Sequence, residues 1–182
     1  MLDPAILMVC IATLAIVTLA SAAPKWRHPE RFRSSLAAFA LLPSFAVSPL
    51  VRLLPLLETL AAIALLFPAA RAPGAGLLIA LFSVFALALA INVARGHTDI
   101  DCGCAGFLTA AAHTPRIGWW HVVRAALLIA LAAATLVSPA DRALVWFDYV
   151  SAGACTLVAV AAWFTLDVLL ANLPKLDSLR NS

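Results

Sequence analysis

Charged residues are scarce in this chain of 182 residues. Only 12% of them are Asp, Glu, Lys or Arg, and 64% are hydrophobic, whereas soluble domains carry about 25% charged and about 45–50% apolar residues. The formal net charge of +3 is too small to indicate a nucleic acid as a partner. The composition therefore excludes an ordinary soluble domain and indicates a single domain that lies in a lipid bilayer.

Cysteine is also sparse. The four cysteines are Cys10, Cys102, Cys104 and Cys155, too few and too scattered for a disulfide framework. Cys10 and Cys155 lie within apolar runs, which favours small buried residues of a core. Both fall in the same half of the expected bundle, so a second redox pair there stays an alternative.

Five apolar stretches are long enough to cross a bilayer, which takes about 20 residues. The expected membrane helices span residues 4–23, 53–70, 76–94, 119–137 and 152–173. A shorter apolar segment, 36–50, contains Pro43 and Pro49, so we expect a short interfacial or re-entrant helix there. The predicted fold class is an all-α integral membrane protein, a helical bundle with about five transmembrane helices and no separate soluble domain.

The longest polar interruption, the loop 95–118, carries the tripeptide Cys102-Gly103-Cys104. Gly103 gives the backbone the freedom to bring the two sulfur atoms together. The resulting disulfide ring is small and strained, and strained, exposed disulfides exchange readily. One cysteine would react through a mixed disulfide and the other would resolve it. The sequence therefore predicts a redox loop in which Cys102 and Cys104 are the catalytic residues of a possible thiol-disulfide oxidoreductase.

A metal site and an inert loop are the competing interpretations of this segment. The loop offers potential ligands in His97, Asp101, Cys102, Cys104 and His113. Their spacing fits no standard zinc pattern, because structural sites usually begin with a gap of two or more residues between cysteines. No metal is therefore predicted, and two ordinary loop cysteines stay the simplest alternative.

Polar residues also occur inside the expected helices, where ionisable groups are costly and usually functional. They are Glu58, Asn92, His121, Arg124 and Asp167. Because a helix rises about 1.5 Å per residue, their depths agree to within about one turn, on the side of the cysteine loop. We expect a polar floor beneath the dithiol, in which a cation favours the thiolate and a carboxylate relays protons. The simpler alternative is that Glu58 and Arg124 pair and only hold the bundle together.

Two arguments about membrane orientation oppose each other. Basic residues gather in the connectors on the side of the cysteine loop, whereas the opposite side holds only Arg71 and Arg142. The positive-inside rule therefore places the loop in the cytoplasm. Disulfide formation usually belongs outside the cytoplasm, so the sequence leaves the side of the loop open.

Three stretches carry a resemblance to a known family. They are the basic connector 25–32 leading to Leu42-Pro43, the helix start Leu54-Pro55-Leu56-Leu57-Glu58, and, most specifically, 90–96 followed by Ile100-Asp101-Cys102-Gly103-Cys104-Ala105-Gly106. Gly118-Trp119-Trp120 and Val123-Arg124 follow. Over about residues 1–137 the chain resembles the MauE family, the methylamine-utilisation membrane proteins within the wider DoxX-like group. Ala105 and Ala125 depart from the aromatic residue and the Asn that are common in that family, and both changes could alter the support of the loop.

The resemblance implies a DoxX-like helical bundle and a role in protein maturation. MauE-type proteins are associated with making the small, disulfide-rich subunit of methylamine dehydrogenase, together with a thioredoxin-like protein of the MauD type. We therefore expect a multi-pass protein of the bacterial inner (plasma) membrane that passes disulfides through Cys102 and Cys104 to such a partner and client. No cofactor is predicted, and a quinone is possible but not supported by the sequence. A small transporter or metal-handling protein and a non-catalytic membrane scaffold are the alternatives.

Overall fold

The computed structural model of the chain describes residues 1–98 and 117–180, with side chains as far as residue 169. Within these ranges the chain forms α-helices and one short 3-10 helix, and it forms no strand there. They are α1 (Pro4–Arg27), α2 (Pro29–Ala38), α3 (Ser44–Leu66), η1 (Pro68–Ala70), α4 (Arg71–Ala94), α5 (Trp119–Ala134) and α6 (Trp146–Arg180). The predicted all-α fold class is confirmed.

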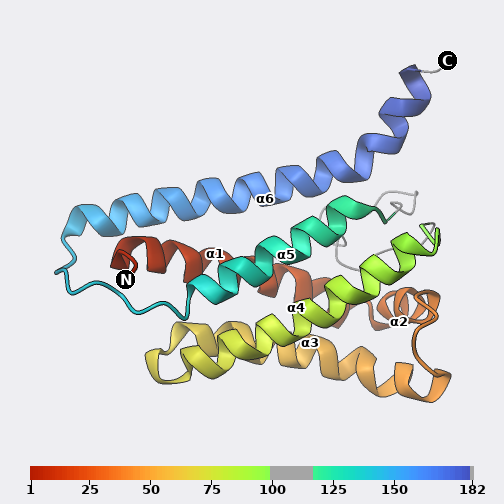
Figure 1. Ribbon diagram of the computed structural model, residues 1–182, viewed down its shortest axis with the longest axis horizontal. Helices are drawn as coiled ribbons and strands as arrows, with labels where there is room; N and C mark the ends of the chain where they lie inside the picture. The colour runs from red at the N-terminus through yellow and green to blue at the C-terminus, as the bar shows by residue number, and fades with distance from the viewer. Residues whose placement is uncertain (99–116, 181–182) are drawn as a thin grey trace.

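The long helices form an antiparallel bundle. In the described part of the chain, α1, α3, the stretch from η1 through α4, and α6 as far as Leu169 are long and apolar enough to cross a membrane. Helix α5 is also apolar but has 16 residues. Successive members of this set run in opposite directions along the long axis (Figure 1). The chain is therefore a multi-pass membrane protein whose connectors alternate between the two ends of the bundle.

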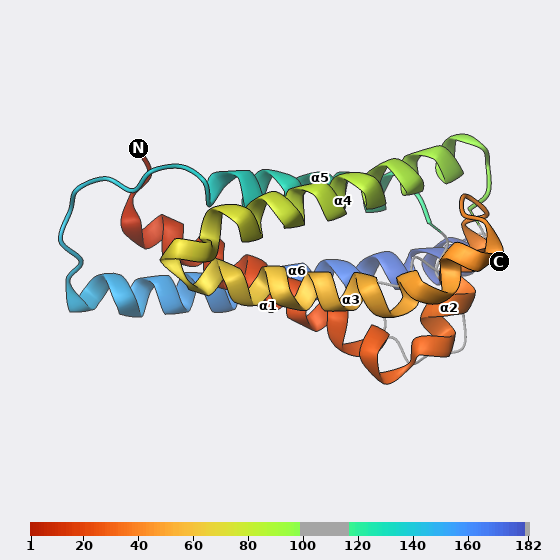
Figure 2. The same cartoon turned by 90° about the horizontal axis from the view of Figure 1, so that it is seen from below.

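The two ends of the bundle differ in what they hold (Figures 1 and 2). The end that we call the α2 end holds α2, the end of α4 and the start of α5. The opposite end, called the η1 end, holds the N-terminus, η1 and the connector 135–145. Trp119 and Trp120 are exposed at the α2 end and Trp146 at the η1 end, as expected for aromatic residues at the two membrane surfaces.

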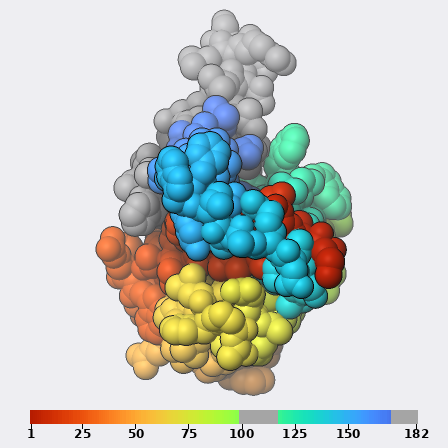
Figure 3. Space-filling view, turned by 90° about the vertical axis from the view of Figure 1, so that its left-hand side faces the viewer, coloured from red at the N-terminus to blue at the C-terminus, as the bar shows by residue number. Residues whose placement is uncertain are grey.

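The N-terminal residues are held at the η1 end, where they lie beside the connector to α6 (Figure 3). The backbone N–H of Ala140 donates to the carbonyl of Leu2 at 2.8 Å. Asp3 caps α1 by accepting a hydrogen bond from the N–H of Ala5 at 2.8 Å, and it accepts another from Arg142 at 3.1 Å. These two donors lower the pKa of the Asp3 carboxyl below its usual value. The contacts of the carboxylate are therefore complete at neutral pH and are lost as the pH falls through the lowered pKa.

Helix boundaries differ from the expected ones where prolines occur. The segment 36–50, expected as a separate short helix, is divided between the last turn of α2 and the first turns of α3. Helix α3 continues through Pro49 and Pro55, and α1 continues past Pro24 to Arg27. Proline is tolerated inside membrane helices because neighbouring groups satisfy the backbone groups that it frees. The prolines therefore do not end these helices.

Helices α3 and α4 form a tight hairpin that η1 closes. Leu65 and Leu78 are fully buried in the main core. Gly74 lets the two helices approach, because a Cβ at this position would lie 2.8 Å from the Cβ of Ala64 and 3.1 Å from the carbonyl oxygen of Ala61. The hairpin therefore has no room for a side chain at residue 74.

We expect Gly74→Ala to destabilise the protein by about 1–3 kcal/mol, because the added methyl group overpacks the hairpin. Gly76→Ala is the matched control, since a Cβ there meets nothing within 4 Å and alanine is otherwise the better helix former by about 1 kcal/mol. Thermal unfolding of the purified protein in detergent should show a lower midpoint for the first variant only. Equal midpoints for the two variants would contradict this packing.

Candidate functional site

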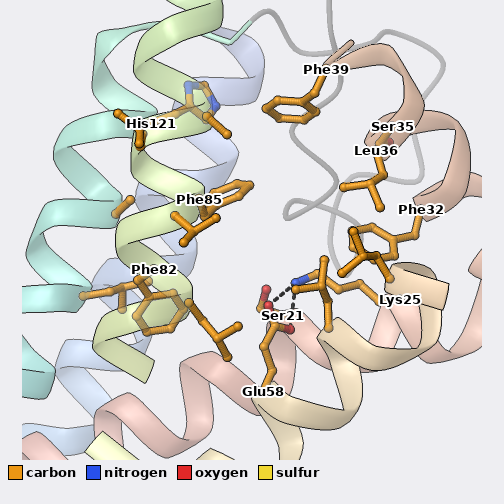
Figure 4. A pocket seen from close by; sticks show the side chains of 18 of the residues that line it. Ser21, Lys25, Phe32, Ser35, Leu36, Phe39, Glu58, Phe82, Phe85 and His121 are labelled. Atoms are coloured by element: carbon orange, nitrogen blue, oxygen red, sulfur yellow. Dashed lines mark hydrogen bonds and ion pairs between the residues drawn. The ribbon is translucent and has the colours of Figure 1, made fainter. Parts of the chain in front are cut away.

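A cavity of about 460 Å³ lies in the half of the bundle nearer the α2 end (Figure 4). Helices α1 to α5 all contribute to its walls, which are mainly apolar. Four aromatic rings line it, those of Phe32, Phe39, Phe82 and Phe85. Its volume falls within the range of small-molecule sites in proteins, about 300–1,000 Å³.

One face of α1 supplies a polar stripe to the cavity. Thr18, Ser21 and Lys25 all line it, and their spacing of three and four residues places them on one side of a helix. Thr18 is only 1% exposed, and its hydroxyl has no hydrogen-bond partner among the described residues. Sequence reasoning missed the stripe because it ended the helix at Pro24. The helical spacing of the three residues is the signal that could have found it.

Lys25 forms an ion pair with Glu58 across the α1–α3 contact. The Lys25 Nζ atom lies 2.5 Å from Oε1 and 2.7 Å from Oε2 of Glu58, and the two side chains are 5% and 12% exposed. One residue further along each helix, the indole N–H of Trp26 donates to the hydroxyl of Thr59 at 3.2 Å. Arg124 was the partner expected for Glu58 in the simpler alternative, but in the structure Glu58 pairs with Lys25.

Arg124 forms a second ion pair, with Asp167. This pair joins α5 to α6. The guanidinium carbon of Arg124 also lies 4.9 Å from the ring centroid of Trp163, one helical turn before Asp167, which is a cation–π geometry. The Nε atom of Arg124 is buried without a hydrogen-bond partner among the described residues. Arg124 lines the cavity too, so both of these ion pairs border the same space.

His121 and Asn92 occupy different positions near the α2 end. His121 lines the cavity from the first turn of α5, and its Nδ1 accepts a hydrogen bond from the N–H of Gly118 at 3.2 Å. In a neutral imidazole this leaves Nε2 to carry the proton and act as a donor. Asn92 is fully buried and donates to the carbonyl of Ala88 at 3.0 Å. It is not among the residues that line the cavity.

The predicted catalytic residues, Cys102 and Cys104, lie outside the described residues, as does most of the loop 95–118. The end of α4, where the loop begins, is described. Gly96 has a φ of 76°, and the N–H groups of Gly96 and His97 donate to the carbonyls of Val93 and Asn92 at 3.1 and 3.0 Å. This is the Schellman motif, whose left-handed residue is usually glycine. The predicted helix end at Gly96 is confirmed.

The two described ends of the cysteine loop meet. The N–H of Ile117 donates to the carbonyl of Thr98 at 2.9 Å. Ile117 is buried in a small cluster with Phe39 and Leu89, which fixes this junction against the end of α2 and the last turns of α4. The loop therefore leaves and rejoins the described structure at the α2 end, the same end as the cavity.

The described part of the site combines an apolar interior with compensated charge. Lys25 and Arg124 each have a carboxylate partner, while the buried Thr18 hydroxyl has no hydrogen-bond partner among the described residues. Among the described residues, no group of three or more His, Cys, Asp or Glu side chains could hold a metal. Such a cavity can admit a lipid-soluble molecule, and the imidazole of His121 in its wall is a group that can accept or donate a proton.

Comparison with known proteins identifies the family. The family model described as "Methylamine utilisation protein MauE" matches residues 3–139. The chain is 44% identical over 126 residues to "Methylamine utilization protein MauE" of Methylophilus methylotrophus, covering 69% of this chain and 65% of that protein. It is 37% identical over 134 residues to the protein of the same name in Paracoccus denitrificans, covering 74% and 70%. No solved structure matches the chain. The chain belongs to the MauE family.

Proposed function

We propose that this protein is a thiol-disulfide exchange component of the bacterial inner membrane, with Cys102 and Cys104 as the exchanging residues. It assists disulfide formation in an exported redox enzyme subunit. The observation that carries the proposal is the Cys102-Gly103-Cys104 motif in a loop whose described ends meet at one end of a membrane bundle. Family membership supports the setting, since the named relatives are methylamine utilisation proteins.

The exchange runs in two balanced steps. A thiolate of a reduced thioredoxin-like protein attacks the Cys102–Cys104 disulfide, which breaks and leaves a mixed disulfide and one free thiol. The second thiolate of the thioredoxin-like protein then attacks the first cysteine sulfur of that same protein, which is held in the mixed disulfide. This step releases the reduced dithiol of Cys102 and Cys104. The thioredoxin-like protein, now oxidised, passes its disulfide to the disulfide-rich client in the same way.

We expect Cys102→Ser to abolish this cycle, because a hydroxyl cannot form the disulfide. Trapping the thiols of the purified protein across a redox series should show wild type switching between oxidised and reduced forms, with the variant fixed in one form. Client disulfide formation should fall at least tenfold. Cys10→Ser and Cys155→Ser are matched controls, since both residues lie in helices outside the motif, and both variants should behave as wild type. If Cys102 and Cys104 stay unreactive in the wild-type protein across the redox series, the proposal is wrong.

The buried ion pair between Lys25 and Glu58 supports the fold around the proposed site. Lys25→Met should destabilise the protein by about 3–5 kcal/mol, because it leaves the Glu58 carboxylate buried and uncompensated. Arg27→Met, an exposed position two residues along α1, is the control and should change stability by less than about 0.5 kcal/mol.

The double variant Lys25→Met with Glu58→Leu tests the same ion pair by removing both charges together. It should recover most of the lost stability, because two apolar side chains replace both charges at once. Thermal unfolding in detergent measures all of these variants under one condition. A Lys25→Met protein as stable as wild type would show that the pair does not stabilise the bundle.

A further inference from the structure

We propose that the cavity between α1, α2, α3, α4 and α5 binds the head group and first isoprene units of a membrane quinone. This inference rests on the proposed function, in which the Cys102–Cys104 dithiol must be reoxidised after each exchange. The quinone is the oxidant. The lining residues that support the site all belong to the part of the chain that the structure describes.

The rim of the cavity faces the hydrocarbon of the bilayer. Val84 and Leu87 of α4 line the cavity and are 70% and 62% exposed, and Val84 lies near the middle of a membrane-spanning helix. Helices α3 and α4 leave η1 side by side and lie farther apart toward the α2 end (Figure 2). Leu50 and Leu54 of α3 line the opposite side of the same space. A ligand therefore enters sideways from the lipid, which selects molecules that are dissolved in the membrane.

The walls suit a flat ring that carries an apolar tail. The Phe39 and Phe85 rings lie with their centroids 6.4 Å apart and their planes at 49°, and Phe32 and Phe82 line the same cavity. Aromatic side chains pack well against flat conjugated rings in offset or tilted geometry. Leucines on α3 and α4 also line the cavity and supply apolar surface along which an isoprenoid chain can lie.

The polar groups favour a neutral ligand that accepts hydrogen bonds. The two cations that border the cavity are each paired with a carboxylate, Lys25 with Glu58 and Arg124 with Asp167, so the wall carries balanced charge and gives an anionic head group little net attraction. The Thr18 hydroxyl and the Arg124 Nε have no partner among the described residues. Buried donors of this kind are costly unless a ligand accepts from them. The two carbonyl oxygens of a quinone are neutral acceptors.

The redox step balances without a further reactant. The two thiols of Cys102 and Cys104 lose two electrons and two protons as the S–S bond forms. The quinone takes up both electrons, and its two carbonyl oxygens each take up one proton to give the quinol. The two protons that the thiols release are the two that the quinol gains, and His121, which lines the cavity, is placed to pass a proton to one of those oxygens.

The test measures binding of tritiated decylubiquinone to the protein in nanodiscs. It uses the full chain with Cys102→Ser and Cys104→Ser, so that binding is measured apart from thiol chemistry. Saturable binding is expected. Ala88→Trp fills the cavity, because Ala88 lines it, and should weaken binding at least tenfold. Ala126→Trp places the same side chain at an exposed position of α5 outside the lining and should leave binding unchanged.

A second variant makes the test independent of packing. Thr18→Val keeps the shape of the side chain but removes its hydroxyl, and it should weaken decylubiquinone binding about three- to tenfold. The competitor decylbenzene, which has the ring and tail without the carbonyls, should displace the probe poorly. Equal competition by decylbenzene, or full affinity in Thr18→Val and Ala88→Trp, would show a site for acyl chains and overturn the inference.

The outcomes separate this inference from the proposed function. Saturable quinone binding together with an unreactive cysteine pair in wild type supports the quinone site and sinks the exchange function alone. A cysteine pair that cycles normally, in a protein that shows no saturable quinone binding, overturns the quinone site alone.

Discussion

Charge that lies inside a membrane bundle must be compensated, and two ion pairs do this in the half of the molecule nearer the α2 end. Lys25 with Glu58 joins α1 to α3, and Arg124 with Asp167 joins α5 to α6. An uncompensated charge in a low dielectric costs several kcal/mol. Each pair therefore restricts the register of the two helices that it joins. The cavity lies between these fixed walls, which is why its polar groups have defined positions in an otherwise apolar interior.

The same charge compensation limits how far buried cations of the bundle can stabilise a thiolate in the loop. The expected polar floor was to supply a cation that favours the thiolate, but both buried cations have carboxylate partners. Basic groups that can act on the loop are instead those at its described beginning, Arg95 and His97, which are exposed. In the proposed function the loop therefore carries out the exchange, and the bundle contributes an apolar cavity with a few polar side chains in its wall.

The sequence allowed the helices and their polarity to be predicted, because long apolar runs and glycine ends are local signals. The helix end at Gly96 is an example, since a left-handed residue after a helix favours glycine whatever surrounds it. Prolines were misleading for the opposite reason. Whether Pro24, Pro49 or Pro55 ends a helix depends on which neighbouring groups satisfy the freed carbonyls, and that is a property of the tertiary structure.

The ion-pair partner of each charged residue was harder to predict than its depth in the bundle. Glu58, His121 and Arg124 were expected at one level, and they do border one cavity, because depth follows directly from position along a helix. The partner of each charge depends instead on which helix faces which. Because α1 contacts α3 and α6, Glu58 pairs with Lys25, and Asp167 lies beside Arg124. The spacing of residues within a single helix does not predict which helices are neighbours.

The extent of the family match gives α6 a distinct role. Residues 3–139 match the family model, and the described residues that line the cavity all lie within that range. Asp167, the counter-ion of Arg124, lies beyond it on α6. The matched region therefore builds the cavity but leaves one buried guanidinium uncompensated. Packing of α6 against α1 supplies the missing carboxylate, so docking of the last helix completes the charge balance on which a neutral ligand depends.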